Sequence, residues 1–147
     1  MKVIAFNKYP ERNKMDGVEF VSVEKLFSES DALTLHAPLN KQSQGIICTK
    51  NIALMKSSAF IINTGRGGLI VESDLKEALD NNTIAGAGLD VLTQEPPPID
   101  HVLLRVRNCI ITPHQAWASK AARQRLMDEL VKNVDGFLKG DLRNLIK

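Results

Sequence analysis

The sequence predicts an α/β protein built on a parallel, doubly wound sheet of the Rossmann type, and two observations lead to this prediction. Short apolar segments of strand length recur along the chain, and stretches with helical periodicity separate several of them. Strands that are apolar throughout are typical of a parallel sheet that helices cover on both faces. The chain of 147 residues is long enough to bury one hydrophobic core, so we expect a single domain over residues 1–147.

The predicted strands are short apolar runs. They lie at residues 3–6, 18–21, 32–35, 60–62, 86–91 and 109–111.

The predicted helices follow residues that commonly cap helix N-termini. Ser22, Thr49, Ser73 and Ser119 each precede a stretch with helical character, and Gly140 is expected to end the last helix. That last helix is the longest. Its apolar positions are Leu126, Met127, Leu130, Val134, Phe137 and Leu138.

Composition excludes several classes of function. The net charge of +2 comes from 19 basic and 17 acidic residues without a basic stripe, so we expect no nucleic-acid partner. No apolar run approaches the roughly 20 residues of a membrane helix, and the N-terminus does not resemble a secretion signal, so we expect a cytoplasmic protein. Cys48 and Cys109 are expected to be buried free thiols. No metal site is predicted.

Polar residues that follow the predicted strands are the candidates for chemistry, because ligands of doubly wound sheets bind at the carboxyl ends of the strands. Arg66 in NTGRGG, Glu95 in LDVLTQEPPP and His114 in ITPHQAW follow three successive predicted strands. Each of these residues also has an alternative interpretation in which it has no catalytic role. Arg66 would be a surface residue of a glycine-rich turn, Glu95 the start of a stiff turn, and His114 a hydrogen-bonded loop histidine.

Together these three side chains meet the needs of 2-keto acid reduction. Arg66 offers a bidentate fork for the substrate carboxylate and can polarise the ketone. His114 can donate the proton to the carbonyl oxygen, and Glu95 would orient His114 by holding its second ring nitrogen. The hydride has to come from a cofactor.

The runs LHAPLN, NTGRGGLIVESDLKEAL, AGLDVLTQEPPP and ITPHQAWASKAARQRLM resemble consecutive signatures of the D-2-hydroxyacid dehydrogenase family. The resemblance implies that Arg66, Glu95 and His114 form the catalytic set, with NAD or NADP as cofactor. The contexts QEPPP and HQAW are most similar to the glycerate dehydrogenases (hydroxypyruvate reductases) of this family. This similarity implies hydroxypyruvate or D-glycerate as substrate and places Trp117 close to the substrate, with ordinary packing as the alternative for Trp117.

The resemblance also implies the residues that contact the cofactor. Besides His114, they are Ala37 and Pro38 beside the ribose and nicotinamide, Thr64 and Arg66 flanking it, and Asp90 toward the carboxamide. Asp90 would otherwise cap a turn.

Asn7 ends the predicted strand where NAD-preferring relatives usually carry an acidic residue for the ribose hydroxyls. Asn7 can bind the ribose without repelling a 2′-phosphate, and Lys8 and Arg12 follow it. NADP is therefore an alternative to NAD as the cofactor. The alternative is that Lys8 and Arg12 belong to a solvated turn.

The dinucleotide-binding fingerprint G-x-G-x-x-G is expected before KVIAF and is absent. Neither Gly65-Arg66-Gly67 nor Gly86-Ala87-Gly88 supplies the third glycine. The sequence therefore predicts an incomplete nucleotide-binding domain that lacks its first strand and glycine-rich loop, with the substrate domain largely absent. The strands that begin at Val3 and Ala32 would then either close up or admit another chain between them.

Two functions follow as hypotheses. The first is an oxidoreductase fragment that acts on a small 2-keto acid, inactive by itself because nothing replaces the missing phosphate cradle. The second is a non-catalytic module that senses nucleotides or binds a partner. A homodimer is expected by resemblance, with a contribution from the last helix.

Overall fold

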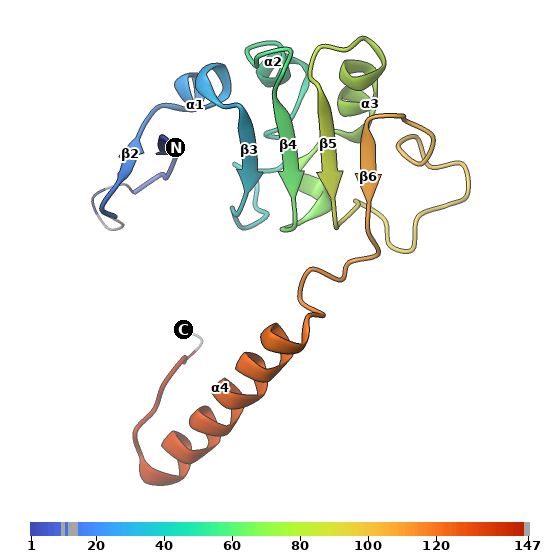
Figure 1. Cartoon of the computed structure of the whole chain (residues 1–147). Coiled ribbons are helices and arrows are strands. Elements are labelled where there is room, and N and C mark those ends of the chain that lie inside the picture. The colour runs from blue at the N-terminus through green and yellow to red at the C-terminus, as the bar shows by residue number, and fades with distance from the viewer. Residues whose placement is uncertain (10, 12–14, 146–147) are drawn as a thin grey trace. The chain divides into compact units, whose positions relative to one another are not determined.

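The computed structural model describes residues 1–9, 11 and 15–145 and divides into two compact units, Met1–Pro113 and His114–Lys147 (Figure 1). The first unit contains the strands and the shorter helices. The second unit contains the long helix α4 (Lys120–Lys139).

A four-stranded parallel sheet is the centre of the first unit. Its strands are β3 (Ala32–Leu35), β4 (Phe60–Asn63), β5 (Gly86–Leu89) and β6 (Cys109–Ile111), and they lie side by side in chain order (Figure 1). All three pairs are parallel, and Leu35, Asn63, Leu89 and Ile111 stand in register at the carboxyl ends. The predicted α/β fold with a parallel sheet is therefore confirmed.

The first two strands form a sheet of their own. β1 (Val3–Ala5) pairs in parallel with β2 (Val18–Phe20), and neither strand joins the larger sheet. The strands at Val3 and Ala32 therefore do not close up. Ion pairs tie the small sheet to α1 (Val23–Glu29) instead: Lys2 Nζ lies 3.1 Å from Glu19 Oε2 and 3.2 Å from Glu29 Oε2.

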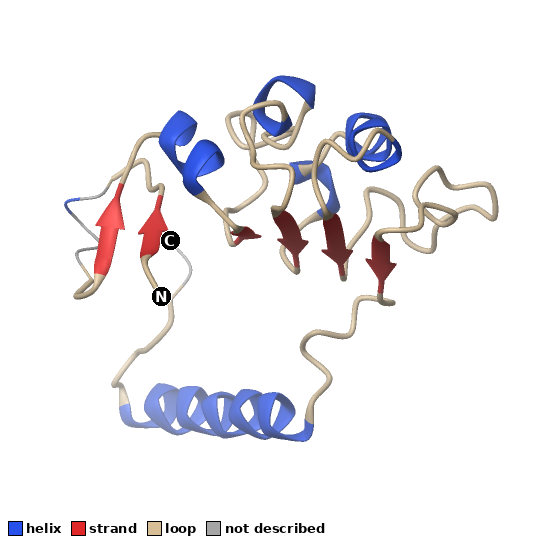
Figure 2. Cartoon of the chain, turned by 45° about the horizontal axis from the view of Figure 1, so that its top comes forward, coloured by secondary structure: helices blue, strands red, loops and turns tan. Residues whose placement is uncertain are grey.

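Helices of the first unit cover one face of the four-stranded sheet (Figure 2). Besides α1 they are α2 (Thr49–Ile52), α3 (Glu72–Asp80) and the 3₁₀ turn η2 (Gly67–Leu69). Phe27, Ile52 and Leu75 from these helices pack with Leu33 and Ile61 of the sheet in a buried core. Removal of these apolar side chains from water is the main stabilisation of the unit.

The opposite face of this sheet is more open. Phe60 is 48% exposed and Ile110 is 72% exposed. On this face the side chains of β4 lie over the glycines of β5: a Cβ added to Gly86 would come 3.1 Å from Phe60 Cε1.

Local capping signals identify two helix starts correctly. Ser22 caps α1 and Ser119 caps α4, each through a side-chain oxygen that accepts a backbone N–H three residues later. Gly140 ends α4 with a left-handed φ of 76°, as predicted.

The two other predicted caps are wrong. The N-cap of α2 is Cys48 and that of α3 is Val71, and neither makes a side-chain capping bond. Asp74 of α3 replaces the missing cap of α2, because its Oδ2 accepts the Thr49 N–H at 2.8 Å. This hydrogen bond lowers the pKa of Asp74 below its usual value.

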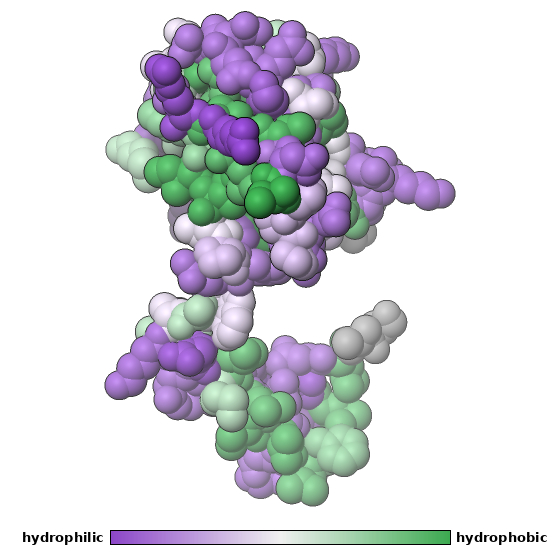
Figure 3. Space-filling view, turned by 90° about the vertical axis from the view of Figure 1, so that its right-hand side faces the viewer, coloured by the Kyte–Doolittle hydropathy of each residue, from purple (hydrophilic) through white to green (hydrophobic). Residues whose placement is uncertain are grey.

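The second unit presents a broad apolar surface along α4. Figure 3 shows hydrophobic residues gathered on the part of the chain that carries this helix. They include Leu126, Met127, Leu130, Val131, Val134, Phe137 and Leu138, all exposed.

Both cysteines are free, and they are half-buried rather than buried. Burial raises the pKa of the Cys109 thiol to about 11. Within the part of the chain that the structure describes, no helix is long and apolar enough to span a bilayer, and no group of side chains is arranged to hold a metal ion.

Candidate active site

The candidate site of the first unit lies at the carboxyl edge of the four-stranded sheet. Because β3, β4 and β5 end in register, the segments that follow them emerge at the same edge. The turn after β4 touches the corner after β3: a Cβ added to Gly68 would come 2.9 Å from Leu39 Cδ2. The edge thus brings the predicted residues Pro38 and Arg66 into neighbouring segments.

Asn63 organises the turn that carries Arg66. It is the last residue of β4, and its side chain is 0% exposed. Its Oδ1 accepts the Gly65 N–H at 3.0 Å, and its Nδ2 donates to the Arg66 carbonyl oxygen at 3.0 Å. Side-chain bonds of this kind replace backbone bonds in tight turns, so Asn63 fixes the backbone of the Arg66 turn.

Arg66 itself is exposed on this turn. One guanidinium nitrogen donates to the Gly65 carbonyl oxygen at 2.8 Å. Arg66 pairs with no carboxylate in the part of the chain that the structure describes, so its charge is not neutralised by the fold. A guanidinium in this state suits an anionic ligand such as a carboxylate.

The segment that carries Glu95 packs directly against the Arg66 turn. A Cβ added to Gly67 would lie 2.0 Å from the Leu92 carbonyl carbon, so only glycine permits this approach. Glu95 follows three residues after Leu92, and its Oε1 accepts the Leu92 N–H at 2.9 Å. Arg66 and Glu95 therefore lie on backbone segments that touch at Gly67 and Leu92.

Asp90 follows β5 and is buried. Its N–H donates to the Asn63 carbonyl oxygen at 2.8 Å, which continues the β4–β5 pairing. Its Oδ1 accepts a hydrogen bond from the Thr112 hydroxyl beyond β6. Asp90 is thus anchored between the ends of two strands. Its role toward the carboxamide stays a prediction.

Ala37, Pro38 and Thr64 are exposed at the same edge. Ser43 Oγ donates to the Pro38 carbonyl oxygen at 2.6 Å and so holds this corner. An exposed apolar corner beside a hydroxyl, with a buried carboxylate on the next strand, fits the flat ring, ribose and carboxamide of a nicotinamide nucleotide.

Asn7 lies beyond β1 and is half-buried. Its Oδ1 accepts the Tyr9 N–H at 2.9 Å. Lys8 Nζ donates to Gln42 Oε1 at 2.8 Å and lies 5.4 Å from the centre of the Tyr9 ring. Arg12 lies outside the described residues. The role of Asn7 toward a ribose stays a prediction.

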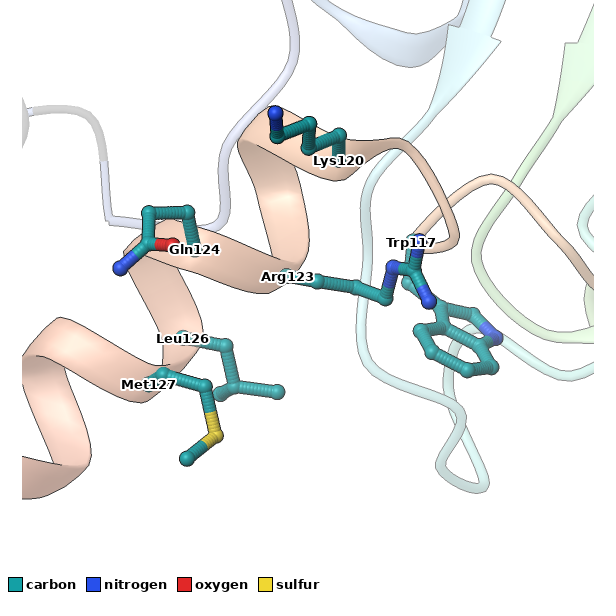
Figure 4. Close-up of a pocket in the computed structure, with 6 residues that line it drawn as sticks. All are labelled: Trp117, Lys120, Arg123, Gln124, Leu126 and Met127. Carbon is teal, nitrogen blue, oxygen red and sulfur yellow. The ribbon is translucent and has the colours of Figure 1, made fainter.

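His114 and Trp117 belong to the second unit. His114 has a positive φ of 49°, and Trp117 Nε1 donates to the His114 carbonyl oxygen at 2.9 Å. Trp117 lines a cavity of about 480 Å³, and in Figure 4 the Arg123 side chain extends toward the indole. The other lining residues are Lys120, Gln124, Leu126 and Met127. The meeting of His114 with Arg66 and Glu95 stays a prediction.

Sequence reasoning missed the residues that support this edge. Asn63 had a local signal, because an asparagine at a strand end before Thr-Gly is typical of a side-chain-stabilised turn. Glu72 and His101 had none, since the two interacting residues are 29 positions apart.

Comparison with known proteins gives a consistent family. Residues 1–116 match the model of the D-isomer specific 2-hydroxyacid dehydrogenase, NAD binding domain. The chain is 45% identical over 147 residues to a hydroxypyruvate reductase of Blautia hydrogenotrophica, covering 99% of this chain and 46% of that protein. It is 44% identical to a glycerate dehydrogenase of Methylorubrum extorquens, covering 100% of this chain and 46% of the relative. The chain thus spans about half the length of these relatives.

Solved structures agree with this. An acyclic imino acid reductase in complex with NADPH and D-Arg matches with a TM-score of 0.86 at 38% identity, over 100% of this chain and 46% of that one. An NAD-complexed D-isomer specific 2-hydroxyacid dehydrogenase of Lactobacillus delbrueckii matches with a TM-score of 0.83 at 27% identity, over 97% and 47% of the two chains.

Proposed function

Since the chain belongs to the D-isomer specific 2-hydroxyacid dehydrogenase family, we propose that it is the cofactor-binding and catalytic part of an NAD(P)-dependent oxidoreductase. The substrate pair that we propose is hydroxypyruvate and D-glycerate. The relatives at 44–45% identity are named for these compounds, whereas the glyoxylate reductases that match are 38–40% identical.

The observation that carries this proposal is the unneutralised charge of Arg66 on a rigid turn beside the Glu95 loop. The guanidinium would bind the carboxylate of the keto acid and polarise its ketone oxygen. The Asn63 hydrogen bonds hold the backbone of this turn, so little ordering remains to be done when the substrate binds.

His114 would donate the proton to the ketone oxygen in reduction and accept it in oxidation, and Glu95 would orient its imidazole. Trp117 would limit the substrate pocket. Ala37, Pro38 and Thr64 would hold the ribose and nicotinamide, Asp90 would accept from the carboxamide, and Asn7 would bind the adenine-side ribose. A bound nicotinamide supplies or accepts the hydride.

Titration of the 147-residue chain with NADH and with NADPH, followed by backbone amide NMR, tests the cofactor site. We expect binding to be weak, because no glycine-rich cradle for the pyrophosphate is present in this sequence. The nucleotide should shift the amide signals of Thr64 and Asp90. Shifts confined to other segments, or no shift with either nucleotide, would contradict the proposed site.

Oxalate, an unreactive stand-in for the keto acid, tests Arg66. Arg66→Lys should weaken oxalate binding by about tenfold, because a lysine ammonium cannot reproduce the bidentate fork. Arg107→Lys is the matched control. Arg107 is exposed and precedes the amino end of β6, whereas the proposed site lies at the carboxyl ends of the strands. Equal effects of the two substitutions on oxalate affinity would show that Arg66 does not bind the carboxylate.

Turnover with hydroxypyruvate separates an enzyme from a nucleotide-sensing module. The chain alone should turn over at no useful rate. In a longer polypeptide that also carries a glycine-rich strand-turn-helix unit, His114→Gln should lower turnover by at least about 10²-fold and leave NADH affinity nearly unchanged. Absence of any turnover in that longer polypeptide would favour the sensing module.

We also propose a homodimer, supported by the exposed apolar residues of α4, which form a surface of the kind that marks association. A chain that stays monomeric at high concentration in sedimentation would contradict this.

A further inference from the structure

A nearly buried carboxylate at the start of α3 holds two points of the loop that carries Glu95. Glu72 Oε1 accepts the Thr93 N–H at 2.8 Å, and Glu72 Oε2 lies 3.1 Å from His101 Nε2. The Glu72 side chain is 16% exposed and that of His101 is 8% exposed. Hydrogen bonds to an ionised carboxylate in such a place are stronger than those between neutral groups.

The hydrogen bonds of His101 determine which ring nitrogen carries the proton. The Leu103 N–H donates to His101 Nδ1 at 3.3 Å, so Nδ1 acts as an acceptor. Nε2 therefore bears the proton, and the Nε2–H donates a hydrogen bond to Glu72 Oε2. The imidazole links the carboxylate at the start of α3 to the backbone that leads into β6.

Thr93 and His101 flank Glu95 on both sides in the sequence. Between them the loop is mostly exposed, and it ends with Ile99, which is 90% exposed, and Asp100. Thr93 also lies against the Arg66 turn, since a Cβ on Gly67 would come 2.3 Å from the Thr93 nitrogen. The loop is thus held at its two ends, and one end is the segment that touches the Arg66 turn.

We propose that Glu72 is a positioning residue for Glu95. With His101 it clamps both ends of loop 93–101 to the first turn of α3, and the clamp sets where Glu95 stands beside the Arg66 turn. The role of Glu95 in this statement rests on the proposed function, whereas the clamp does not.

Glu72→Gln breaks the clamp with little change of shape. The glutamine oxygen can still accept the Thr93 N–H, but its amide N–H₂ then faces the Nε2–H of His101. The other tautomer of His101 does not relieve this conflict, because a proton on Nδ1 would face the Leu103 N–H. Glu77→Gln is the matched control, since Glu77 is an exposed residue of the same helix and the change removes the same charge.

Amide hydrogen exchange on the 147-residue chain, with ¹⁵N shifts of the His101 ring, tests the proposal. In Glu72→Gln we expect the N–H groups of Thr93 and Leu92 to exchange at least about tenfold faster. The Leu92 N–H is the informative one because it donates to Glu95 Oε1. The amides of Ile61 and Ala87 in the sheet should not change, and Glu77→Gln should leave all four amides unchanged.

Faster exchange of Thr93 with an unchanged Leu92 would overturn the positioning of Glu95, and a uniform increase that includes Ile61 and Ala87 would reduce Glu72 to a general stabiliser. If Glu72→Gln fails to fold, His101→Asn provides the test. The shorter asparagine side chain keeps an acceptor for the Leu103 N–H but does not reach Glu72. This variant should therefore also speed the hydrogen exchange of the Leu92 amide. An unaffected Leu92 in His101→Asn would overturn the proposal. Since no nucleotide is used, this test and the cofactor test fail independently.

Discussion

Replacement of Asn63 by alanine should destabilise the first unit strongly, because one buried amide satisfies two backbone groups of the Arg66 turn. The change leaves the Gly65 N–H without its acceptor and the Arg66 carbonyl without its donor. Each buried polar group left unsatisfied costs about 1–3 kcal/mol. Asn63 is 0% exposed, so water cannot replace the amide without opening the turn. Because both hydrogen bonds are only partly buried, we expect the lower part of this range for each group, which gives a loss of about 2–4 kcal/mol in the free energy of unfolding.

Urea unfolding followed by circular dichroism measures this loss as a lower midpoint with an unchanged slope. Asn108→Ala is the control, since Asn108 is exposed and the same substitution there should change stability by no more than about 0.5 kcal/mol. A loss below about 1 kcal/mol for Asn63→Ala would refute the argument, because the turn would then hold its shape without the side chain.

Two further predictions concern the same edge and the helices behind it. Gly67→Ala should cost about 3 kcal/mol in urea unfolding, because its Cβ would lie 2.0 Å from the Leu92 carbonyl carbon. Gly68→Ala should cost much less, because its Cβ would meet only the mobile end of the Leu39 side chain, and equal losses would contradict the packing described. The Thr49 N–H lowers the pKa of Asp74, so the ionised carboxylate stabilises the fold above the ordinary carboxyl pKa, and this contribution is lost as the pH falls through the folded-state value. Asp74→Asn should therefore lower the Tm at neutral pH by an amount that shrinks toward acid pH, and a difference independent of pH would rule out this linkage.

Several features of the fold were predictable because they depend on residues close together in the sequence. The bounds of β3 and β6 follow from short apolar runs, and the structure places both strands where the sequence predicts them. Ser22 and Ser119 cap their helices through bonds that span three positions, so a local signal suffices.

The start of α3 and the separate β1–β2 sheet were not predictable in this way. A cap at Ser73 predicts that α3 begins at Asp74, yet the helix begins two residues earlier at Glu72, whose carboxylate binds Thr93 and His101. In the separate sheet Val3 pairs with Val18, and no local pattern indicates that these two strands stay apart from the larger sheet.

The sequence by itself determined the type and order of the elements and the chemistry available at their ends, including Arg66, Glu95 and Asp90. Only the tertiary structure decided that the Arg66 turn and the Glu95 segment touch through Gly67 and Leu92, and that Asn63 and Glu72 hold them. The physical reason is the range of the interactions. Periodicity and capping act within a few residues, whereas a glycine contact or a carboxylate bond joins segments that only the folded sheet brings within a few ångströms of each other.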